Sequence, residues 1–305
     1  YTVPAGASMS EVLEAITSSG RSTCGMMLNF RIGIAKSDVV ISDRDLTSDS
    51  FVEKVRFDAG ADPLPPEYLE VAEDPALNFQ ITIAEGVTSW QIVDSLRKAD
   101  FLTGELEAVP DEGTLAPGSY EVKRGADRLA LVEEMKKRQA VVLAEAWEGR
   151  AEGLPYDTPE EALIMASIVE KETGIAEERG LVASVFVNRL QQGMRLQTDP
   201  TVIYGITKGE GVLGRGLRQS ELRKETPWNT YVIDGLPPTP IANPGAEAIK
   251  AAMNPETSDF LFFVADGTGG HVFAETLDEH NENVAKWRAI EAELGTEGET
   301  GVQGE

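Results

Sequence analysis

Cysteine, long apolar runs and positive charge are scarce in this sequence, and each scarcity excludes something. Cys24 is the only cysteine, so no disulfide can form within the chain, which is compatible with either a reducing or an oxidising compartment. No apolar run approaches the roughly 18 residues that a membrane-spanning helix needs. Because the chain opens at Tyr1 and not at a methionine, we expect a segment of a longer protein, with any signal or anchor upstream.

Basic residues are outnumbered by acidic ones. The 27 Lys and Arg residues stand against 52 Asp and Glu, which gives a net charge of −25. A surface of this sign disfavours DNA, RNA or an anionic membrane surface as a partner. The 305 residues, 41% hydrophobic and 26% charged, are typical of a soluble globular protein with one large or two ordinary domains.

The first half contains two strand-turn-helix patterns. One covers residues 1–20, and the other covers 79–101, where Phe79, Ile81 and Ile83 alternate ahead of a turn and an amphipathic helix. Residues 21–76 lack clear periodicity and are interpreted as an insertion or an extended connection. We therefore divide the chain at the ranges that follow: a module at 1–125, a linking helix and loop at 126–158, a second domain at 159–291, and a disordered acidic tail at 292–305.

The second domain begins with a well-marked helix. Thr158 can cap it, Pro159 suits its first position, and Glu161 completes a capping box. From residue 162 to 169 only Ser167 is polar, so the helix is expected to be buried on all sides. Gly174 is expected to end it in the left-handed conformation.

Glu170 follows directly on this apolar run, in the stretch MASIVEKETG. It can be a paired surface residue, or it can be a general acid whose pKa an apolar pocket raises. At 100° per residue, Leu163 and Ala166 flank Glu170, whereas Glu172 points about 160° away. The two carboxylates are therefore not expected to serve one site.

Polar groups suited to a sugar follow this helix. Asn188 lies at the edge of an apolar helical stripe and is expected to be hydrogen-bonded in a partly buried place. Gln197, Thr198 and Asp199 stand together in a turn closed by Pro200. Asp199 can instead simply fix that turn.

A proline-stiffened loop supplies further candidates. Trp228 and Tyr231 offer aromatic faces for stacking, with Asn229 between them. The alternative is a turn-rich cover over the core, with Asn229 capping a local turn.

A metal site is not indicated. His271 and His280, the only histidines, lie nine positions apart, one in a predicted hairpin and one in the helix after it. That spacing does not fit a zinc-binding helix motif, and neither a P-loop nor a G-x-S-x-G motif is present. We expect neither a metal nor a cofactor.

Five blocks in order carry a resemblance over roughly residues 77–290: ASIVEKETG, ASVFVNRL, MRLQTDPTVIYG, NTYVIDGLPPTPIANPG and FLFFVADGTGGHVFAETLDEHN. They closely resemble the MltG/YceG-like endolytic murein transglycosylases. Trp228 and Thr239 depart from the family pattern, which affects loop detail. The resemblance implies an α+β fold, with an N-terminal LysM-like strand and helix module before a mixed, lysozyme-like catalytic domain built on a central buried helix.

The resemblance also implies a reaction. It is cleavage of the MurNAc-β-1,4-GlcNAc bond within peptidoglycan strands, without hydrolysis, to leave 1,6-anhydro-MurNAc ends. The family's catalytic glutamate falls on Glu170, which would act first as general acid and then as general base, while Glu172 would be structural. The substrate-binding residues implied by analogy are Gln197, Thr198, Asp199, Asn229, Tyr231 and Asn188.

Two other functions remain open from the sequence. Were Asp199 a second catalytic carboxylate, the enzyme would be a lysozyme-type hydrolase. The chain can also be a peptidoglycan-binding scaffold without catalysis. Family resemblance further implies a single N-terminal anchor in the bacterial inner membrane, a catalytic part facing the periplasm, and cell-wall synthases (penicillin-binding proteins) as partners.

Overall fold

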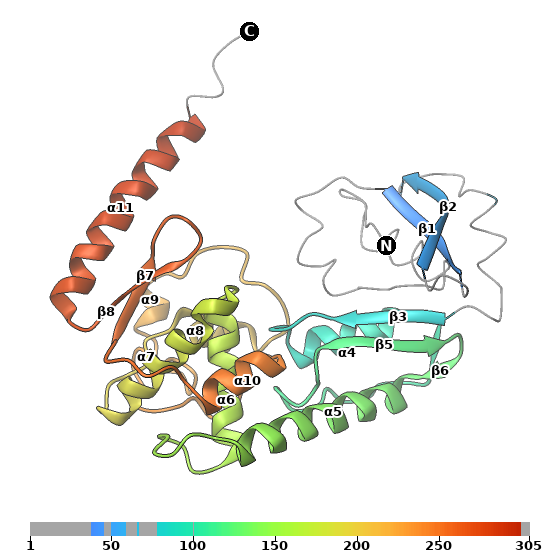
Figure 1. The fold of residues 1–305 in the computed structure, drawn as a ribbon, viewed down its shortest axis with the longest axis horizontal. Coiled ribbons are helices and arrows are strands. Elements are labelled where there is room, and N and C mark those ends of the chain that lie inside the picture. The colour runs from blue at the N-terminus through green and yellow to red at the C-terminus, as the bar shows by residue number, and fades with distance from the viewer. Residues whose placement is uncertain (1–37, 46–49, 59–65, 67–77, 100, 300–305) are drawn as a thin grey trace, which may run out of the picture. The chain divides into compact units, whose positions relative to one another are not determined.

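A computed structural model describes residues 38–45, 50–58, 66, 78–99 and 101–299 (Figure 1). The chain forms two compact units, residues 1–140 and 141–305, and the division falls within the helix α5 (Arg128–Glu148). The strand-turn-helix pattern expected at residues 1–20 lies outside the described residues. Each unit is treated by itself below.

The first unit contains a hairpin that the sequence analysis did not predict. Strand β1 (Asp38–Asp45) pairs antiparallel with β2 (Ser50–Asp58), with an irregularity between Ile41 and Ser42. Both strands lie within the range 21–76, which had been interpreted as an insertion or an extended connection. The alternation of Phe51, Val55 and Phe57 is the signal that this interpretation overlooked.

The second predicted strand-turn-helix pattern is confirmed. Strand β3 (Asn78–Ile83) is followed by α4 (Ser89–Lys98), whose capping box joins Thr88 and Gln91. β3 pairs antiparallel with β5 (Gly118–Lys123), and β4 (Leu102–Thr103) pairs parallel with β6 (Ala126–Asp127). The core of this unit joins the sheet to α4 and to the first half of α5, and it includes Ile81, Ile83, Ile92, Val93, Leu96, Phe101, Tyr120, Leu131 and Met135.

The second unit is organised around α6 (Pro159–Glu172). Its predicted start is confirmed: the Thr158 hydroxyl accepts from the Glu161 N–H, and the Glu161 carboxylate accepts from the Thr158 N–H. Every residue from Ala162 to Val169 is buried, as the apolar run predicted. The predicted end is wrong in detail. Thr173 caps the helix in an extended conformation, so Gly174 is not needed in the left-handed region.

Further helices surround α6. They are the short 3-10 turn η1 (Ala176–Glu178), α7 (Arg179–Gln191), α8 (Asp199–Thr207), α9 (Gln219–Leu222) and α10 (Ala246–Met253). Figure 1 shows α6 and α10 side by side, and residues of both belong to one apolar core with α7. Ser167, the one polar residue of the buried run, donates to the Ile164 carbonyl at 2.7 Å and accepts from the Ile241 N–H at 3.0 Å. Its polarity is therefore satisfied inside the core.

A hairpin and a long helix complete this unit. Strand β7 (Phe262–Ala265) pairs antiparallel with β8 (His271–Ala274). The last helix, α11 (Leu277–Glu299), runs past residue 292, where a disordered tail had been predicted. Once a helix is nucleated, each added residue gains one hydrogen bond, which a composition argument does not take into account. No helix among the described residues is both long and apolar enough to cross a membrane.

Candidate active site

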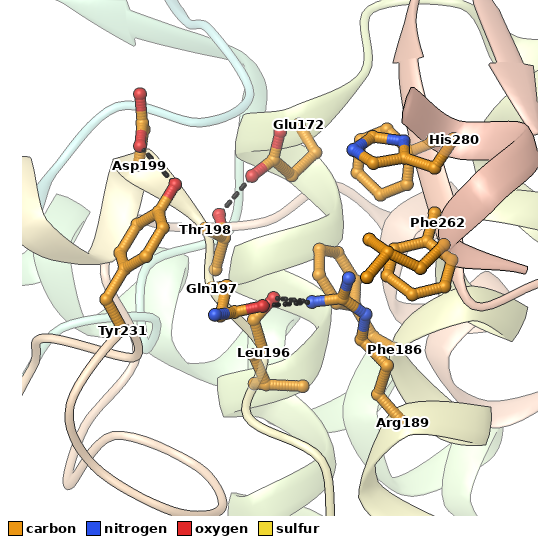
Figure 2. Close-up of a pocket in the computed structure, with 12 residues that line it drawn as sticks. Glu172, Phe186, Arg189, Leu196, Gln197, Thr198, Asp199, Tyr231, Phe262 and His280 are labelled. Carbon is orange, nitrogen blue, oxygen red and sulfur yellow. Dashed lines mark hydrogen bonds between the residues drawn. The ribbon is translucent and has the colours of Figure 1, made fainter. Parts of the chain in front are cut away.

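A pocket of about 400 Å³ opens in the second unit, within the range typical of small-molecule sites (Figure 2). It combines polar groups on one side with an aromatic wall on the other. The lining residues come from α6, α7, the segment before α8, the start of α8, the loop after α9, β7 and α11: Glu172, Phe186, Arg189, Leu196, Gln197, Thr198, Asp199, Tyr231, Phe262, Phe263, Leu277 and His280.

Glu172 is the carboxyl group that α6 presents to this pocket. The side chain is half-buried, and the Thr198 hydroxyl donates a hydrogen bond to its carboxylate. Burial raises the pKa of Glu172, and the negative charge of Asp199 acts in the same direction. The Thr198 hydrogen bond and His271 oppose the shift without cancelling it. Glu172 is thus a carboxyl group whose surroundings favour its neutral form.

The segment that carries Gln197 and Thr198 is held rigidly against the loop that carries Tyr231. The Gln197 N–H donates to the Thr230 carbonyl at 3.2 Å, and the Thr198 N–H donates to the Thr230 hydroxyl at 3.1 Å. Gln197 adopts a φ of 56°, which is uncommon for a residue other than glycine. Backbone strain of this kind persists only where neighbouring contacts enforce it, and it concentrates at functional sites.

Asp199 and Tyr231 form a hydrogen-bonded pair at the pocket. The Tyr231 hydroxyl donates to Asp199 Oδ1 at 2.7 Å. Burial, followed by this contact with Asp199, raises the pKa of Tyr231. Asp199 is also the first residue of α8, where the helix dipole favours a negative charge. The residue therefore begins a helix and lines the pocket at the same time.

Glu170 occupies a different environment and is not among the residues that line this pocket. Its carboxylate accepts the N–H of Gly245 at 3.0 Å, at the N-terminal cap of α10. The N-terminus of a helix attracts an anionic group, so the contact suits a charged carboxylate that joins α6 to α10. The expected separation of Glu170 from Glu172 is observed. The sequence analysis associated an apolar pocket with Glu170, whereas the pocket in Figure 2 is lined by Glu172.

The two candidate asparagines, Asn229 and Asn188, hydrogen-bond to the backbone of neighbouring segments. Asn229 is 0% exposed, and its amide donates to the carbonyls of Glu221, Leu222 and Lys224 and accepts from the Tyr231 N–H. Asn188 donates to the carbonyls of Ser258 and Phe260, in the partly buried position expected for it. Neither residue lines the pocket. The turn-capping interpretation of Asn229 describes what is observed.

The aromatic wall and Arg189 were not among the predicted site residues. Phe186 and Arg189 lie on α7, and Phe262 and His280 come from segments more than 70 positions further along the chain. Phe186 had been recognised only as part of an apolar stripe. Only tertiary packing brings these segments together, so no local sequence pattern could have identified the aromatic wall of the pocket.

The histidines and Trp228 also have defined surroundings. His271 Nδ1 pairs with the Glu178 carboxylate at 2.7 Å, and the His280 ring stacks on Phe262 with 5.2 Å between centroids. Trp228 does not line the pocket. Its indole donates to the Thr239 hydroxyl at 3.0 Å, and Lys208 Nζ lies 3.2 Å from the ring centroid.

The arrangement can carry out acid-base chemistry on a polar ligand. Glu172 supplies a carboxyl group whose pKa is raised by burial, and Gln197, Thr198 and Tyr231 supply hydrogen-bonding groups beside it. Figure 2 shows Asp199 and Tyr231 on one side of the pocket, Phe262 and His280 on the other, and Glu172 between them. Apolar and aromatic surface beside a few fixed polar groups is the usual composition of a ligand site.

Comparisons with known proteins agree with the resemblance. Over 178 residues the chain is 35% identical to a Bacillus subtilis protein, covering 58% of this chain and 48% of the relative. Over 182 residues it is 35% identical to a Streptococcus pneumoniae protein, covering 57% of this chain and 32% of the relative. Both are named endolytic murein transglycosylase, and the matched segments span about half of their length or less.

A solved structure and a family model extend the comparison to most of the chain. A YceG-like protein from Listeria monocytogenes aligns with a TM-score of 0.60 at 26% identity, covering 92% of this chain and 96% of the other. The YceG-like family model matches residues 1–286. The chain therefore belongs to the YceG-like family.

Proposed function

We propose that this chain is the catalytic part of an endolytic murein transglycosylase. It cleaves the MurNAc-β-1,4-GlcNAc bond within peptidoglycan strands and leaves 1,6-anhydro-MurNAc ends. The names of the Bacillus and Streptococcus relatives support the reaction class. The single observation that supports the assignment of the acid is the half-buried carboxyl group of Glu172 in the pocket, with its raised pKa.

The role of general acid thus moves from Glu170, where the motif resemblance had put it, to Glu172. A general acid needs to be neutral before it donates its proton, and burial favours the neutral form of Glu172. Glu170 accepts a helix N-terminal N–H, an arrangement suited to an anion. In this proposal Glu170 stabilises the start of α10, and Glu172 carries out the proton transfers.

One carboxyl group suffices for the reaction. Glu172 donates its proton to the glycosidic oxygen as the bond from that oxygen to C1 breaks. The C6 hydroxyl of the same sugar then attacks C1, and the Glu172 carboxylate accepts the hydroxyl proton, so the acid is regenerated and no water is consumed. A hydrolase would need a second carboxylate to attack or to activate water. Asp199 is engaged by the Tyr231 hydroxyl and is assigned a positioning role.

The remaining pocket groups bind the sugar in this proposal. Gln197 and Thr198 lie on a strained, hydrogen-bonded segment, so little conformational entropy is lost when they bind a ligand. Tyr231 contributes an aromatic face. Asn229 and Asn188 act indirectly, by holding the loops that carry the binding groups.

The proposal extends to location and to the N-terminal part. We assign the enzyme to the outer side of the bacterial inner membrane, where its polymer substrate lies, with cell-wall synthases as partners. The unit before α5 is assigned a LysM-like role in glycan binding, and the second unit a lysozyme-like one. Retention of peptidoglycan by residues 1–140 and by residues 141–305, each compared with the full chain, tests the division.

A matched pair of substitutions tests the catalytic assignment. Glu172→Gln should reduce release of anhydro-muropeptides from sacculi by about 10²- to 10⁴-fold, the usual contribution of a general acid. Glu170→Gln makes the same chemical change two positions away on the same helix and should retain most activity if the variant remains folded. Products are identified by mass spectrometry, and sacculus binding is measured by co-sedimentation.

The outcomes separate the alternatives. Loss of activity in Glu170→Gln with activity retained in Glu172→Gln would return the acid to Glu170. Reducing ends in place of anhydro ends would favour a lysozyme-type hydrolase that uses Asp199. If the wild type binds sacculi but releases no product where a known transglycosylase does, the chain is a glycan-binding scaffold.

A further inference from the structure

Arg189 is a buried cation in the pocket that the proposed reaction does not use. The residue is 8% exposed and lies on α7. Its Nε donates to the Leu261 carbonyl at 2.6 Å, and its Nη1 donates to the carbonyls of Arg195 and Leu196 at 3.1 and 2.8 Å. Gln197 Oε1 lies 3.4 Å from the same Nη1. Each of these acceptors is electrically neutral.

Among residues 141–290, whose side chains the structure describes in this unit, Arg189 has no anionic partner within ion-pair distance. Burial lowers the pKa of the guanidinium, with Tyr231 as an opposing influence. A buried charge without a counter-charge is costly, so its retention calls for a compensating group. Neutral carbonyls satisfy its donors only in part.

One edge of the guanidinium remains available. Nη2 makes no hydrogen bond to a described residue, and it is not among the fully buried unpaired atoms of this unit. Arg189 is also among the residues that line the pocket. Figure 2 shows the guanidinium between the Leu196–Gln197 segment and Phe262. The Phe262 ring centroid lies 5.1 Å from its central carbon, which orients the group.

No other cation competes for an anion in this pocket. Burial, together with the positive charge of Arg189, lowers the pKa of His280, which favours the neutral imidazole. The other ionisable groups of the lining, Glu172, Asp199 and Tyr231, are acids. A guanidinium edge in an aromatic surround is well suited to a carboxylate.

We propose that Arg189 is a substrate-specificity residue that binds a carboxylate carried on the muramyl sugar. The inference deepens the proposed function and rests on it for the identity of the glycan. The chemistry is shared by two sources: the lactyl carboxylate of a peptide-free strand and a free carboxylate of the stem peptide. A neutral polymer of N-acetylglucosamine has neither group and would leave the Arg189 charge unpaired.

The test measures binding in the Glu170→Gln and Glu172→Gln double variant, so that turnover is suppressed whichever of the two glutamates is the general acid. Four ligands are compared by calorimetry: a peptide-free glycan oligomer, the same oligomer with its lactyl carboxyls converted to amides, a peptide-bearing oligomer, and a chitin oligomer of equal length. Amidation should weaken binding by about tenfold or more if the lactyl carboxylate pairs with Arg189. If only the peptide-bearing oligomer shows dependence on Arg189, the stem peptide is the source.

Substitutions identify Arg189 as the group responsible. Arg189→Gln should abolish the difference between the acidic and neutral oligomers, and Arg189→Lys should restore part of that difference. Arg195→Gln is the matched control, because Arg195 is exposed, pairs with Asp234 at 2.8 Å and does not line the pocket. The comparison of ligands on the unsubstituted arginine does not depend on whether Arg189→Gln folds.

Equal binding of the acidic and amidated oligomers, together with equal effects of Arg189→Gln on every ligand, would overturn the inference. Arg189 would then be a structural brace for the 195–197 segment and β7. These outcomes are independent of the catalytic assignment. A carboxylate-dependent affinity can persist in a protein that proves to be a scaffold, and a transglycosylase can prove indifferent to the carboxylate.

Discussion

Glu170 and Glu172 differ by two positions on α6, and their surroundings give them different chemistry. Glu170 accepts a hydrogen bond from the Gly245 N–H at the start of α10. Glu172 faces a partly apolar pocket and accepts a hydrogen bond from the Thr198 hydroxyl. A turn of 100° per residue puts them on nearly opposite sides of the helix. One helix can therefore present one carboxyl group for structure and another for proton transfer.

The raised pKa of Glu172 predicts a pH-dependent stability difference. Because the folded-state pKa lies above the unfolded value, the wild type is most favoured below the unfolded pKa and loses stability as the pH rises through the folded pKa. Glutamine cannot ionise. The stability of Glu172→Gln relative to wild type should therefore increase as the pH rises above the ordinary glutamate pKa of 4.5, by at most about 1.4 kcal/mol per pH unit.

Denaturant unfolding at several pH values and constant ionic strength checks this difference. Glu170→Gln is the control and should not show the same rise. A stability difference for Glu172→Gln that is independent of pH would mean that the carboxyl group is not held neutral by burial.

At the scale of elements, the start of α6 helps to position Glu172, the proposed acid. Thr158 and Glu161 cap the helix reciprocally, and the buried run from Ala162 to Val169 fixes its rotation in the core. The rotation of the helix sets the direction in which the side chain of Glu172 points, at the C-terminal end of α6. The segment 196–199 and the loop around Asn229 then form the opposite side of the pocket through hydrogen bonds to Thr230.

Removing the cap should destabilise the second unit. Thr158→Ala loses the acceptor of the Glu161 N–H and should lower the free energy of unfolding by about 1 kcal/mol. Thr158→Ser retains an equivalent hydroxyl and should stay within a few tenths of a kcal/mol of wild type. Tryptophan fluorescence during chemical denaturation reports the change. Equal losses in both variants would show that the cap hydrogen bond is not the stabilising feature.

At the scale of the whole molecule, a net charge of −25 has to be reconciled with the proposed substrate, peptidoglycan, which is itself acidic. Long-range attraction cannot drive the encounter. Binding is expected to depend on hydrogen bonds, on aromatic surface and, if the inference on Arg189 holds, on one short-range ion pair. Salt screens exposed charges strongly and partly buried pairs much less.

Glycan affinity should therefore depend weakly on ionic strength. Between ~50 and ~200 mM salt we expect the dissociation constant of a peptide-free oligomer to change by less than about threefold, whereas proteins that bind a polyanion through many basic contacts lose about a thousandfold or more. Calorimetry with Glu172→Gln at several salt concentrations checks this. A steep loss of affinity would point to an exposed basic surface that binds the strand.

The sequence by itself determined the local features. Neighbouring residues determine the cap of α6, its buried run and the strand-turn-helix pattern at 79–101, because periodicity and capping depend on positions three or four apart. The family blocks can likewise be read directly from the sequence. The sequence also established that Glu170 and Glu172 face apart. It could not decide which of them meets a pocket, since α6 is apolar on every side and its pattern favours neither direction.

Only the tertiary structure decided the composition of the site. The pocket joins Glu172 to Arg189, Tyr231 and His280, which are distant in the sequence and meet through packing of α6, α7, β7 and α11. The same packing buries Asn229 against backbone carbonyls, and it buries Arg189 without an anionic partner among the described side chains of this unit. Burial and charge pairing are properties of the folded surroundings, and a residue's neighbours in the chain do not specify them.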